Sequence, residues 1–360
     1  MQSSSATYIP RLDHLRFVAV VLVFGWHSLH MNAVIPFDYS PPGFFFSIFE
    51  EGHTGVSLFL TLSGFVFASL CDGREILYAP FIRNRVLRIL PLLAVWTVLN
   101  YQLLRPPADH LFAILVGLQN QEFPGPGWTV IVEFQLYLVF PFLLAFAERY
   151  GTKYLFGVTL VTLVLRGIAW LVTRNVEFIA YWTVLGRADE FVFGMIGFRA
   201  YRRYGKILGN PFCLFGVLFA WLCIYHWFNR LGGYYFSATH LAGSALWIYF
   251  PTLEGLFYAT LTASYLSLPW RGIPALGRAA AWMGSVSYSM YLCHAMVVQA
   301  AFSSATSLGI RVTTPLRIVL FSYCVVLPLV VACSALTYNV IELPFLRLRH
   351  PYLRERRAGE

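Results

Sequence analysis

Charged residues are scarce in this chain of 360 residues. They make up 12% of the sequence, about half of the roughly 25% that is usual in soluble proteins. Hydrophobic residues account for 58%, and 18% of all residues are Phe, Trp or Tyr. A soluble fold of this length would have to expose apolar patches that aggregate. The composition therefore excludes a disordered chain, a disulfide-stapled secreted domain and an ordinary cytosolic enzyme.

Recognisable cysteine motifs are also missing. The six cysteines show no CxxC or CxxH spacing and fall mostly within apolar stretches, so we expect small core residues rather than disulfides. No metal site is expected either, because His27 and His30 have no third ligand nearby in the sequence. Without an internal repeat or a long polar segment, the sequence predicts one membrane domain over residues 1–347. A basic cytoplasmic tail follows over residues 348–360.

Long apolar runs, separated by Pro, Gly or charged residues, dominate what is present. They predict an all-α integral membrane protein, a bundle of about ten transmembrane helices. The expected spans are residues 12–33, 54–71, 86–104, 128–147, 154–173, 188–203, 207–228, 241–267, 279–303 and 315–341.

Basic residues are distributed unevenly over the loops between these spans. If the N-terminus is cytoplasmic, 19 of the 26 Lys and Arg residues fall in cytoplasmic segments and 6 in outer segments. Cytoplasmic loops of membrane proteins carry this excess. We therefore expect both termini in the cytoplasm. The same bias explains the net charge of +9 without a nucleic-acid partner.

Ionisable residues within the spans are costly and usually functional. His27 lies about six residues, roughly 9 Å, below the outer end of the first span. Glu133 lies roughly 7.5 Å below the same surface in the fourth span, and Asp189 enters from that side. A histidine and carboxylates at one level predict a catalytic base with an orienting partner. The alternative is that His27 only forms a hydrogen bond with a neighbouring helix.

Arginines favour an anion-binding region at the cytoplasmic side. Arg16 and His27 are eleven positions apart, so they share one helix face about 16 Å apart along the axis. Arg83, Arg85 and Arg88 lie at the mouth of the third span. Because guanidinium groups bind phosphate with two hydrogen bonds, they suit a nucleotide-bearing donor. Positive-inside anchoring is the alternative explanation.

A further polar stripe lies in the ninth span. Ser287, Tyr291 and His294 follow i, i+4, i+7 spacing, and Tyr288 is adjacent. These side chains line a cavity or act as polar contacts between helices, and the pattern alone leaves both open. His30 either shares the cavity with His27 or only flanks it.

Several short motifs occur in one order between residues 8 and 347. They are Leu12-Asp-His-Leu-Arg16 with His27, Gly55–Phe65, Arg83-Asn-Arg85, Trp128–Tyr137, Arg187–Phe191 with Gly194-Met195, Ser287–His294 and Glu342-Leu-Pro344. In this order they resemble acyltransferase family 3, the polytopic bacterial membrane O-acyltransferases. Four positions depart from the family pattern: His14 replaces Gly, Ser57 replaces Asp, Cys293 replaces a common Trp, and Phe134 replaces the second acidic residue beside Glu133.

The resemblance implies a multi-pass acyltransferase domain over residues 1–347, located in the bacterial inner membrane. It implies transfer of an acyl group, acetyl by default, from cytosolic acyl-CoA to a hydroxyl of a carbohydrate-type acceptor. Such acceptors include lipopolysaccharide, exopolysaccharide, an oligosaccharide or a glycosylated small molecule. Acyl-CoA would be a co-substrate, no permanently bound cofactor is expected, and the remaining partner is membrane lipid.

Residue roles follow from the same resemblance. Arg16, Arg83, Arg85 and Arg88 would bind the donor phosphates. His27 would act as general base or become acylated first, with Glu133 or Asp189 fixing its tautomer. The alternative function is a proton-coupled transporter or exporter that uses the same buried charges.

Overall fold

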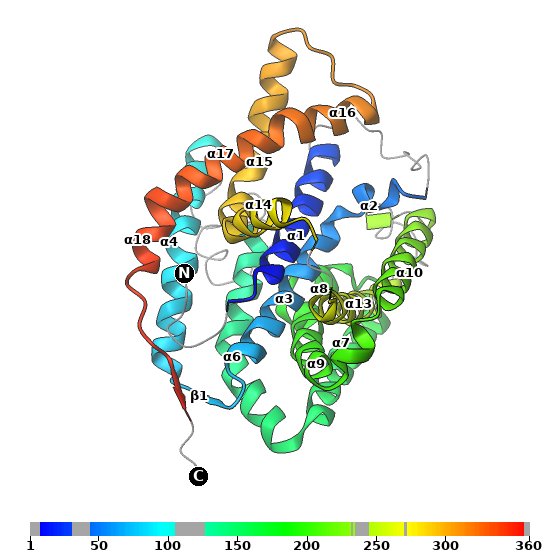
Figure 1. The fold of residues 1–360 in the computed structure, drawn as a ribbon. Helices are drawn as coiled ribbons and strands as arrows, with labels where there is room; N and C mark the ends of the chain where they lie inside the picture. Colours follow the sequence, from blue (N-terminus) through cyan, green and yellow to red (C-terminus); the bar gives the residue numbers. More distant parts are fainter. Residues whose placement is uncertain are drawn as a thin grey trace.

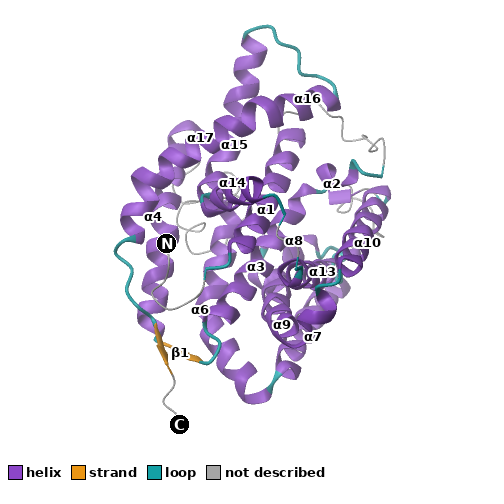
Figure 2. Cartoon of the chain, in the orientation of Figure 1, coloured by secondary structure: helices purple, strands orange, loops and turns teal. Residues whose placement is uncertain are grey.

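The computed structural model describes residues 8–30, 44–104, 127–231, 233–234, 245–269 and 272–355. This part of the chain is almost entirely helical, with one small two-stranded sheet (Figure 2). The helices are α1 (Pro10–His30), α2 (Ser47–Glu50), η1 (Gly52–Thr54), α3 (Gly55–Leu70), α4 (Tyr78–Leu104), α6 (Trp128–Tyr150), α7 (Thr152–Thr173), α8 (Glu177–Trp182), α9 (Val184–Leu208), α10 (Pro211–Arg230), α13 (Phe250–Ser267), α14 (Pro274–Ser285), α15 (Ser287–Ser307), α16 (Pro315–Phe321), η4 (Ser322–Val326), α17 (Leu327–Thr337), η5 (Tyr338–Glu342) and α18 (Leu343–Leu346).

The predicted all-α membrane class is confirmed in its coarse form. Within the described residues, six helical segments are long and apolar enough to cross a membrane. They are Pro10–His30, Gly52–Leu70, Trp128–Tyr150, Thr152–Thr173, Pro211–Arg230 and Leu316–Leu346. The expected spans 86–104 and 188–203 fall within α4 and α9, and 241–267 overlaps α13, with residues 241–244 outside the described part. Ten spans and cytoplasmic termini remain predictions.

The expected single span over residues 279–303 is wrong. The chain forms α14 and α15 instead, separated at Val286, whose φ of −99° and ψ of 9° are not helical. The break lies in the sequence Gly284-Ser-Val-Ser287, in which every residue is a weaker helix former than Ala or Leu. At Gly284, α14 crosses α1 so closely that an added Cβ would lie 1.8 Å from the Asp13 carbonyl oxygen.

Two glycines bring α3 and α9 into direct backbone contact at the centre of the bundle. A Cβ on Gly64 would lie 1.9 Å from the carbonyl oxygen of Phe191, and one on Gly194 would lie 2.0 Å from that of Thr61. Small residues allow this close approach between helices in membranes, where packing rather than the hydrophobic effect holds helices together. The contact fixes α9, which carries the buried polar residues Arg187 and Asp189.

A short antiparallel sheet joins the α3–α4 connection to the end of the described chain. Strand β1 (Arg74–Ile76) pairs with β2 (Leu353–Glu355), an arrangement that the sequence did not predict. The register places Arg74 opposite Glu355 and Glu75 opposite Arg354, so both cross-strand pairs carry opposite charges. Figure 1 shows the two strands together at one end of the molecule. Both segments therefore lie on the same side of the bundle.

We expect Gly194→Ala to destabilise the protein. The new methyl group would overlap the Thr61 carbonyl, a backbone atom that cannot rotate away, and overpacking of this kind costs about 1–3 kcal/mol or more. Gly157→Ala on α7 is the matched control, because no atom lies within 4 Å of its added Cβ. Thermal unfolding in detergent should show a lower midpoint for Gly194→Ala alone. Equal midpoints for the two variants would contradict the close contact.

Candidate active site

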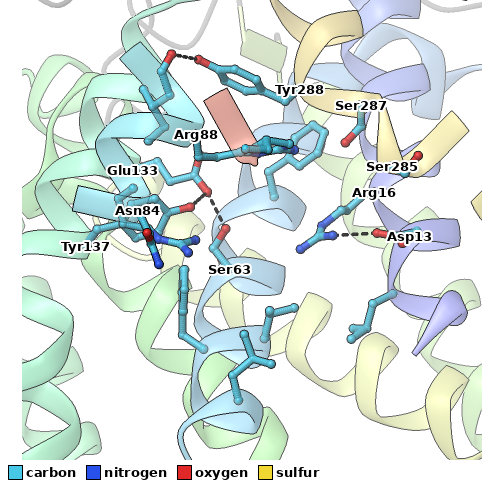
Figure 3. A pocket seen from close by; sticks show the side chains of 18 of the residues that line it. Asp13, Arg16, Ser63, Asn84, Arg88, Glu133, Tyr137, Ser285, Ser287 and Tyr288 are labelled. Atoms are coloured by element: carbon cyan, nitrogen blue, oxygen red, sulfur yellow. Dashed lines mark hydrogen bonds and ion pairs between the residues drawn. The ribbon is translucent and has the colours of Figure 1, made fainter. Parts of the chain in front are cut away.

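A cavity of about 690 Å³ lies among α1, α3, α4, α6, α15 and the C-terminal segment (Figure 3). This volume is within the usual range for small-molecule sites. Seven residues predicted for the site line it: Arg16, Arg85, Arg88, Glu133, Ser287, Tyr288 and Tyr291. Five others do not line it: His27, His30, Arg83, Asp189 and His294.

The wall formed by α4 is strongly basic and aromatic. The guanidinium carbon of Arg85 lies 4.9 Å from the ring centroid of Phe67 and 5.7 Å from that of Tyr352. Its Nε is buried without a hydrogen-bond partner among the described residues. Stacking on ring faces orients the guanidinium and attracts its charge without neutralising it. Arg85 therefore presents an uncompensated positive charge at the cavity.

Arg88 lies one helical turn further along α4, and its charge is neutralised by a carboxylate. It forms an ion pair with Glu342, which also accepts a hydrogen bond from Ser289 at 3.2 Å. The guanidinium carbon of Arg88 lies 5.4 Å from the ring centroid of Tyr288, whose hydroxyl donates to the Ile89 carbonyl. Arg83 lies on the same helix but is exposed and outside the cavity lining. The predicted trio of arginines thus separates into two cavity residues and one surface residue.

The C-terminal segment contributes basic groups to the cavity, and two of them, Arg349 and His350, lie in the stretch that the sequence analysis assigned to a tail. Arg347, Arg349 and His350 line the cavity. Burial and the neighbouring guanidiniums of Arg85 and Arg88 lower the pKa of Arg349 to about 9. Five arginines but only two carboxylates line the cavity. This wall is suited to a ligand with several negative charges.

Arg16 and Asp13 form the opposite wall of the cavity. The two side chains are 2.6 Å apart, one turn apart on α1, and Figure 3 shows Arg16 directed into the cavity. Asp13 also accepts a hydrogen bond from the Tyr8 hydroxyl at 2.7 Å. The acidic residue thereby holds Arg16 in place from behind. Arg16 therefore lines the cavity, and its role in donor binding stays a prediction.

Glu133 lies in the cavity wall but does not contact His27. Its Oε1 accepts hydrogen bonds from the hydroxyls of Ser63, at 2.5 Å, and of Tyr137 (Figure 3). The expected pairing of Glu133 with His27 is therefore absent from the structure. Depth along the helix axes was the only basis for that expectation, and it does not determine which way each helix faces.

Asp189 also binds side chains other than His27. Its carboxylate forms a fully buried ion pair with Arg166 at 2.6 Å and accepts a hydrogen bond from Thr252. Because Arg166 and Asp189 are both inaccessible, this group stabilises the contact between α7, α9 and α13. The expected role of Asp189 as the orienting partner of His27 does not agree with these contacts.

The side chain that contacts His27 is another histidine. Nε2 of His294, on α15, lies 3.2 Å from Nδ1 of His27, and the ring centroids are 4.7 Å apart. The same Nδ1 lies 2.9 Å from the carbonyl oxygen of Val23. The sequence analysis named both histidines but did not pair them, because they are 267 positions apart.

The hydrogen-bond pattern assigns the tautomers of this pair. Nδ1 of His294 lies 2.6 Å from the Tyr291 carbonyl oxygen, which only accepts, so this nitrogen carries the proton. Nε2 of His294 is then an acceptor, and Nδ1 of His27 donates to it and to the Val23 carbonyl. Nε2 of His27 is left with a free lone pair. Since His27 is only half-buried, this nitrogen is the candidate base.

Tyr291 connects the cavity with the histidine pair. It lines the cavity, its hydroxyl accepts a hydrogen bond from Thr129 at 2.6 Å, and its ring centroid is 5.7 Å from that of His294. The inner end of the cavity is thus one aromatic side chain away from His294, which in turn contacts His27. The predicted stripe of Ser287, Tyr291 and His294 contributes to both places.

His30 belongs to a separate cluster at the end of α1. Its Nε2 lies 3.4 Å from a carboxylate oxygen of Glu50, and the buried His53 lies 3.0 Å from Glu51. His30 flanks the His27 pair rather than sharing the cavity. In the part of the chain that the structure covers, no three His, Cys, Asp or Glu side chains are arranged to hold a metal ion.

Comparison with known protein families gives one match. The family model described as an acyltransferase domain, that of acyltransferase family 3, matches residues 9–337. The match covers nearly the whole chain and confirms the resemblance seen in the motifs. Searches of curated proteins and of solved structures find no match. The chain belongs to acyltransferase family 3, and it is a membrane acyltransferase by membership.

We expect His294→Ala to lower acyl transfer by about tenfold to a hundredfold, because correct orientation of a general base carries part of its typical 10²–10⁴-fold contribution. The variant removes the acceptor that holds His27 Nδ1–H. His294→Gln is the matched comparison, since its amide oxygen can accept the same hydrogen bond, and it should retain more activity than Ala. Turnover of purified protein measures both. Equal turnover of His294→Ala and the parent would contradict the pairing.

Proposed function

We propose that this chain transfers an acyl group, acetyl by default, from acyl-CoA to a hydroxyl of a carbohydrate-type acceptor. The observation that carries the proposal is a single cavity with a basic mouth and an inner end next to the histidine pair. A donor with a polyphosphate end, a long thin arm and a reactive thioester matches that order of features. Family membership supports acyl transfer, and the arginines favour CoA as the carrier.

The donor phosphates would occupy the mouth, where Arg85, Arg349 and Arg347 face the cavity. The arm would then pass Arg16 and Glu133 and approach Tyr291. Arg16 and His27 are about 16 Å apart along α1, so the path runs roughly half the thickness of a bilayer core. Glu133, held by two hydroxyls, suits an amide N–H of the arm but repels phosphate. This separation of charges sets the direction in which the donor enters.

His27 would perform the proton transfer. Nε2 accepts the proton of the acceptor hydroxyl while the hydroxyl oxygen attacks the thioester carbon. The C–S bond breaks, and the leaving thiolate takes up the proton to give free CoA. Val23 and His294 hold the imidazolium through Nδ1–H during the step. In the second version of the reaction His27 itself is acylated and passes the acyl group to the hydroxyl.

The carbohydrate-type acceptor is proposed because members of the family act on such acceptors. A surface polysaccharide, lipopolysaccharide or oligosaccharide presented at the outer face of a bacterial inner membrane fits a donor that enters from the cytosol. Trp26, whose ring centroid lies 4.7 Å from that of His27, gives this end of α1 an aromatic surface. An aromatic side chain with a polar tip suits the apolar faces and hydroxyls of a sugar.

We expect His27→Ala to abolish transfer while acyl-CoA binding is kept, because the substitution removes the base but none of the arginines. Loss of a general base costs about 10²–10⁴-fold in rate. The measurement uses acyl-CoA with a labelled acyl group and counts free CoA released together with labelled acceptor.

Near-native turnover of His27→Ala would contradict the assignment of the base. A chain that moves a labelled solute across vesicles but leaves the thioester intact would instead be a transporter, the alternative that the buried charges allow.

A further inference from the structure

We propose that the C-terminal segment Arg347–Leu353 is part of the donor site, and that Arg349 and Arg85 form a clamp for a phosphate group of the donor. The proposal rests on the proposed function, because it takes acyl-CoA as the ligand. It assigns a binding role to a segment that the sequence suggested was only a basic tail. Figure 1 shows this segment ending beside β1 after passing α4.

Three guanidiniums meet at this wall with a single carboxylate between them. Arg85 and Arg88 both act on the charge of Arg349, and Glu342 is the acidic residue near it. Glu342 is already bound by Arg88 and Ser289. Arg85 and Arg349 form no ion pair with any carboxylate of the described chain. Two positive charges are therefore left without compensation.

Burial makes this excess charge unfavourable without a ligand. The Nε atoms of Arg85 and Arg349 are both buried, and neither finds a hydrogen-bond partner among the described residues. A buried N–H donor without a partner is unfavourable, and more so when the group is charged. A phosphate oxygen would accept from both guanidiniums, since the planar fork of arginine matches phosphate geometry. One phosphate thus satisfies both the charge and the open donors.

The segment is held in position by contacts that do not involve the ligand. Asn84 on α4 donates to the His350 carbonyl at 2.6 Å and accepts from the His350 amide at 3.1 Å. The β1–β2 sheet fixes the next residues, and the buried ring of Tyr352 packs against Phe81. Arg349 is therefore anchored by the residues that directly follow it. Its guanidinium needs little reorganisation to bind, which favours affinity.

The test measures the dissociation constant of CoA for the full chain in phosphatidylcholine nanodiscs. We expect Arg349→Gln to weaken binding by about tenfold or more, as loss of a charge-assisted hydrogen bond predicts. Arg354→Gln is the matched control, because Arg354 directly follows the segment but is exposed and outside the cavity. It should leave the CoA affinity unchanged.

Asn84→Ala provides a second variant that keeps both guanidiniums. Loss of its two hydrogen bonds to His350 should weaken CoA binding severalfold. In the double variant with Arg349→Gln, the loss of binding free energy should be smaller than the sum of the two single losses, because both residues act through one segment. Monodisperse elution and an unchanged thermal midpoint confirm that each variant is folded.

Equal CoA affinity of the parent, Arg349→Gln and Arg354→Gln would overturn the clamp while leaving CoA as the donor. No CoA binding by the parent chain would overturn the proposed donor itself. Nanodiscs that contain phosphatidylglycerol separate the two sources of phosphate. If this lipid competes with CoA in the parent but not in Arg349→Gln, the site binds a lipid headgroup, which also overturns the proposal.

Discussion

A charged side chain inside a membrane protein has to be compensated, because neither lipid nor packed helix solvates it. At the centre of the bundle, buried ion pairs between helices meet this requirement. Arg166 pairs with Asp189, and Arg187 contacts Glu190 at 2.5 Å and Glu254 at 3.5 Å. These groups tie α7, α9 and α13 together around the glycine contact with α3. Compensated charge of this kind positions the helices and leaves chemistry to other residues.

Three residues that escape this compensation lie along the proposed reaction path. Arg85 and Arg349 present unmatched charge at the cavity mouth, and His27 presents a free ring nitrogen beyond its inner end. His27 is oriented by a carbonyl and a neutral histidine, where many hydrolases use a carboxylate. Because Glu133 does not pair with His27, its carboxylate can contact the donor arm midway along the proposed path, where two hydroxyl groups hold it. Residues whose charge is neutralised by a partner hold the helices together, and residues whose charge is not neutralised are left for binding and catalysis.

Much of the fold could be predicted from the sequence, since long apolar runs are sufficient to locate helices in a membrane protein. The clustering of Arg85 and Arg88 before a span correctly indicated that both face one cavity, and their role in anion binding stays a prediction. The break at Val286 was missed because the short stretch Gly284–Ser287 lies between two apolar runs. Contacts between distant segments could not be derived: the His27–His294 pair and the attachment of residues 353–355 to β1 depend on how helices rotate and cross. Residue depth gave the wrong partner for Glu133, which contacts Ser63 and Tyr137.

The central claim is that one donor molecule spans the distance from the C-terminal arginines to His27. A cryo-electron microscopy structure with a non-hydrolysable acyl-CoA analogue tests it most directly. We expect a phosphate between Arg85 and Arg349, the arm alongside Arg16 and Glu133, and the thioester-equivalent carbon next to Nε2 of His27. Phosphate density at the exposed Arg83, or a reactive carbon far from His27, would contradict the account.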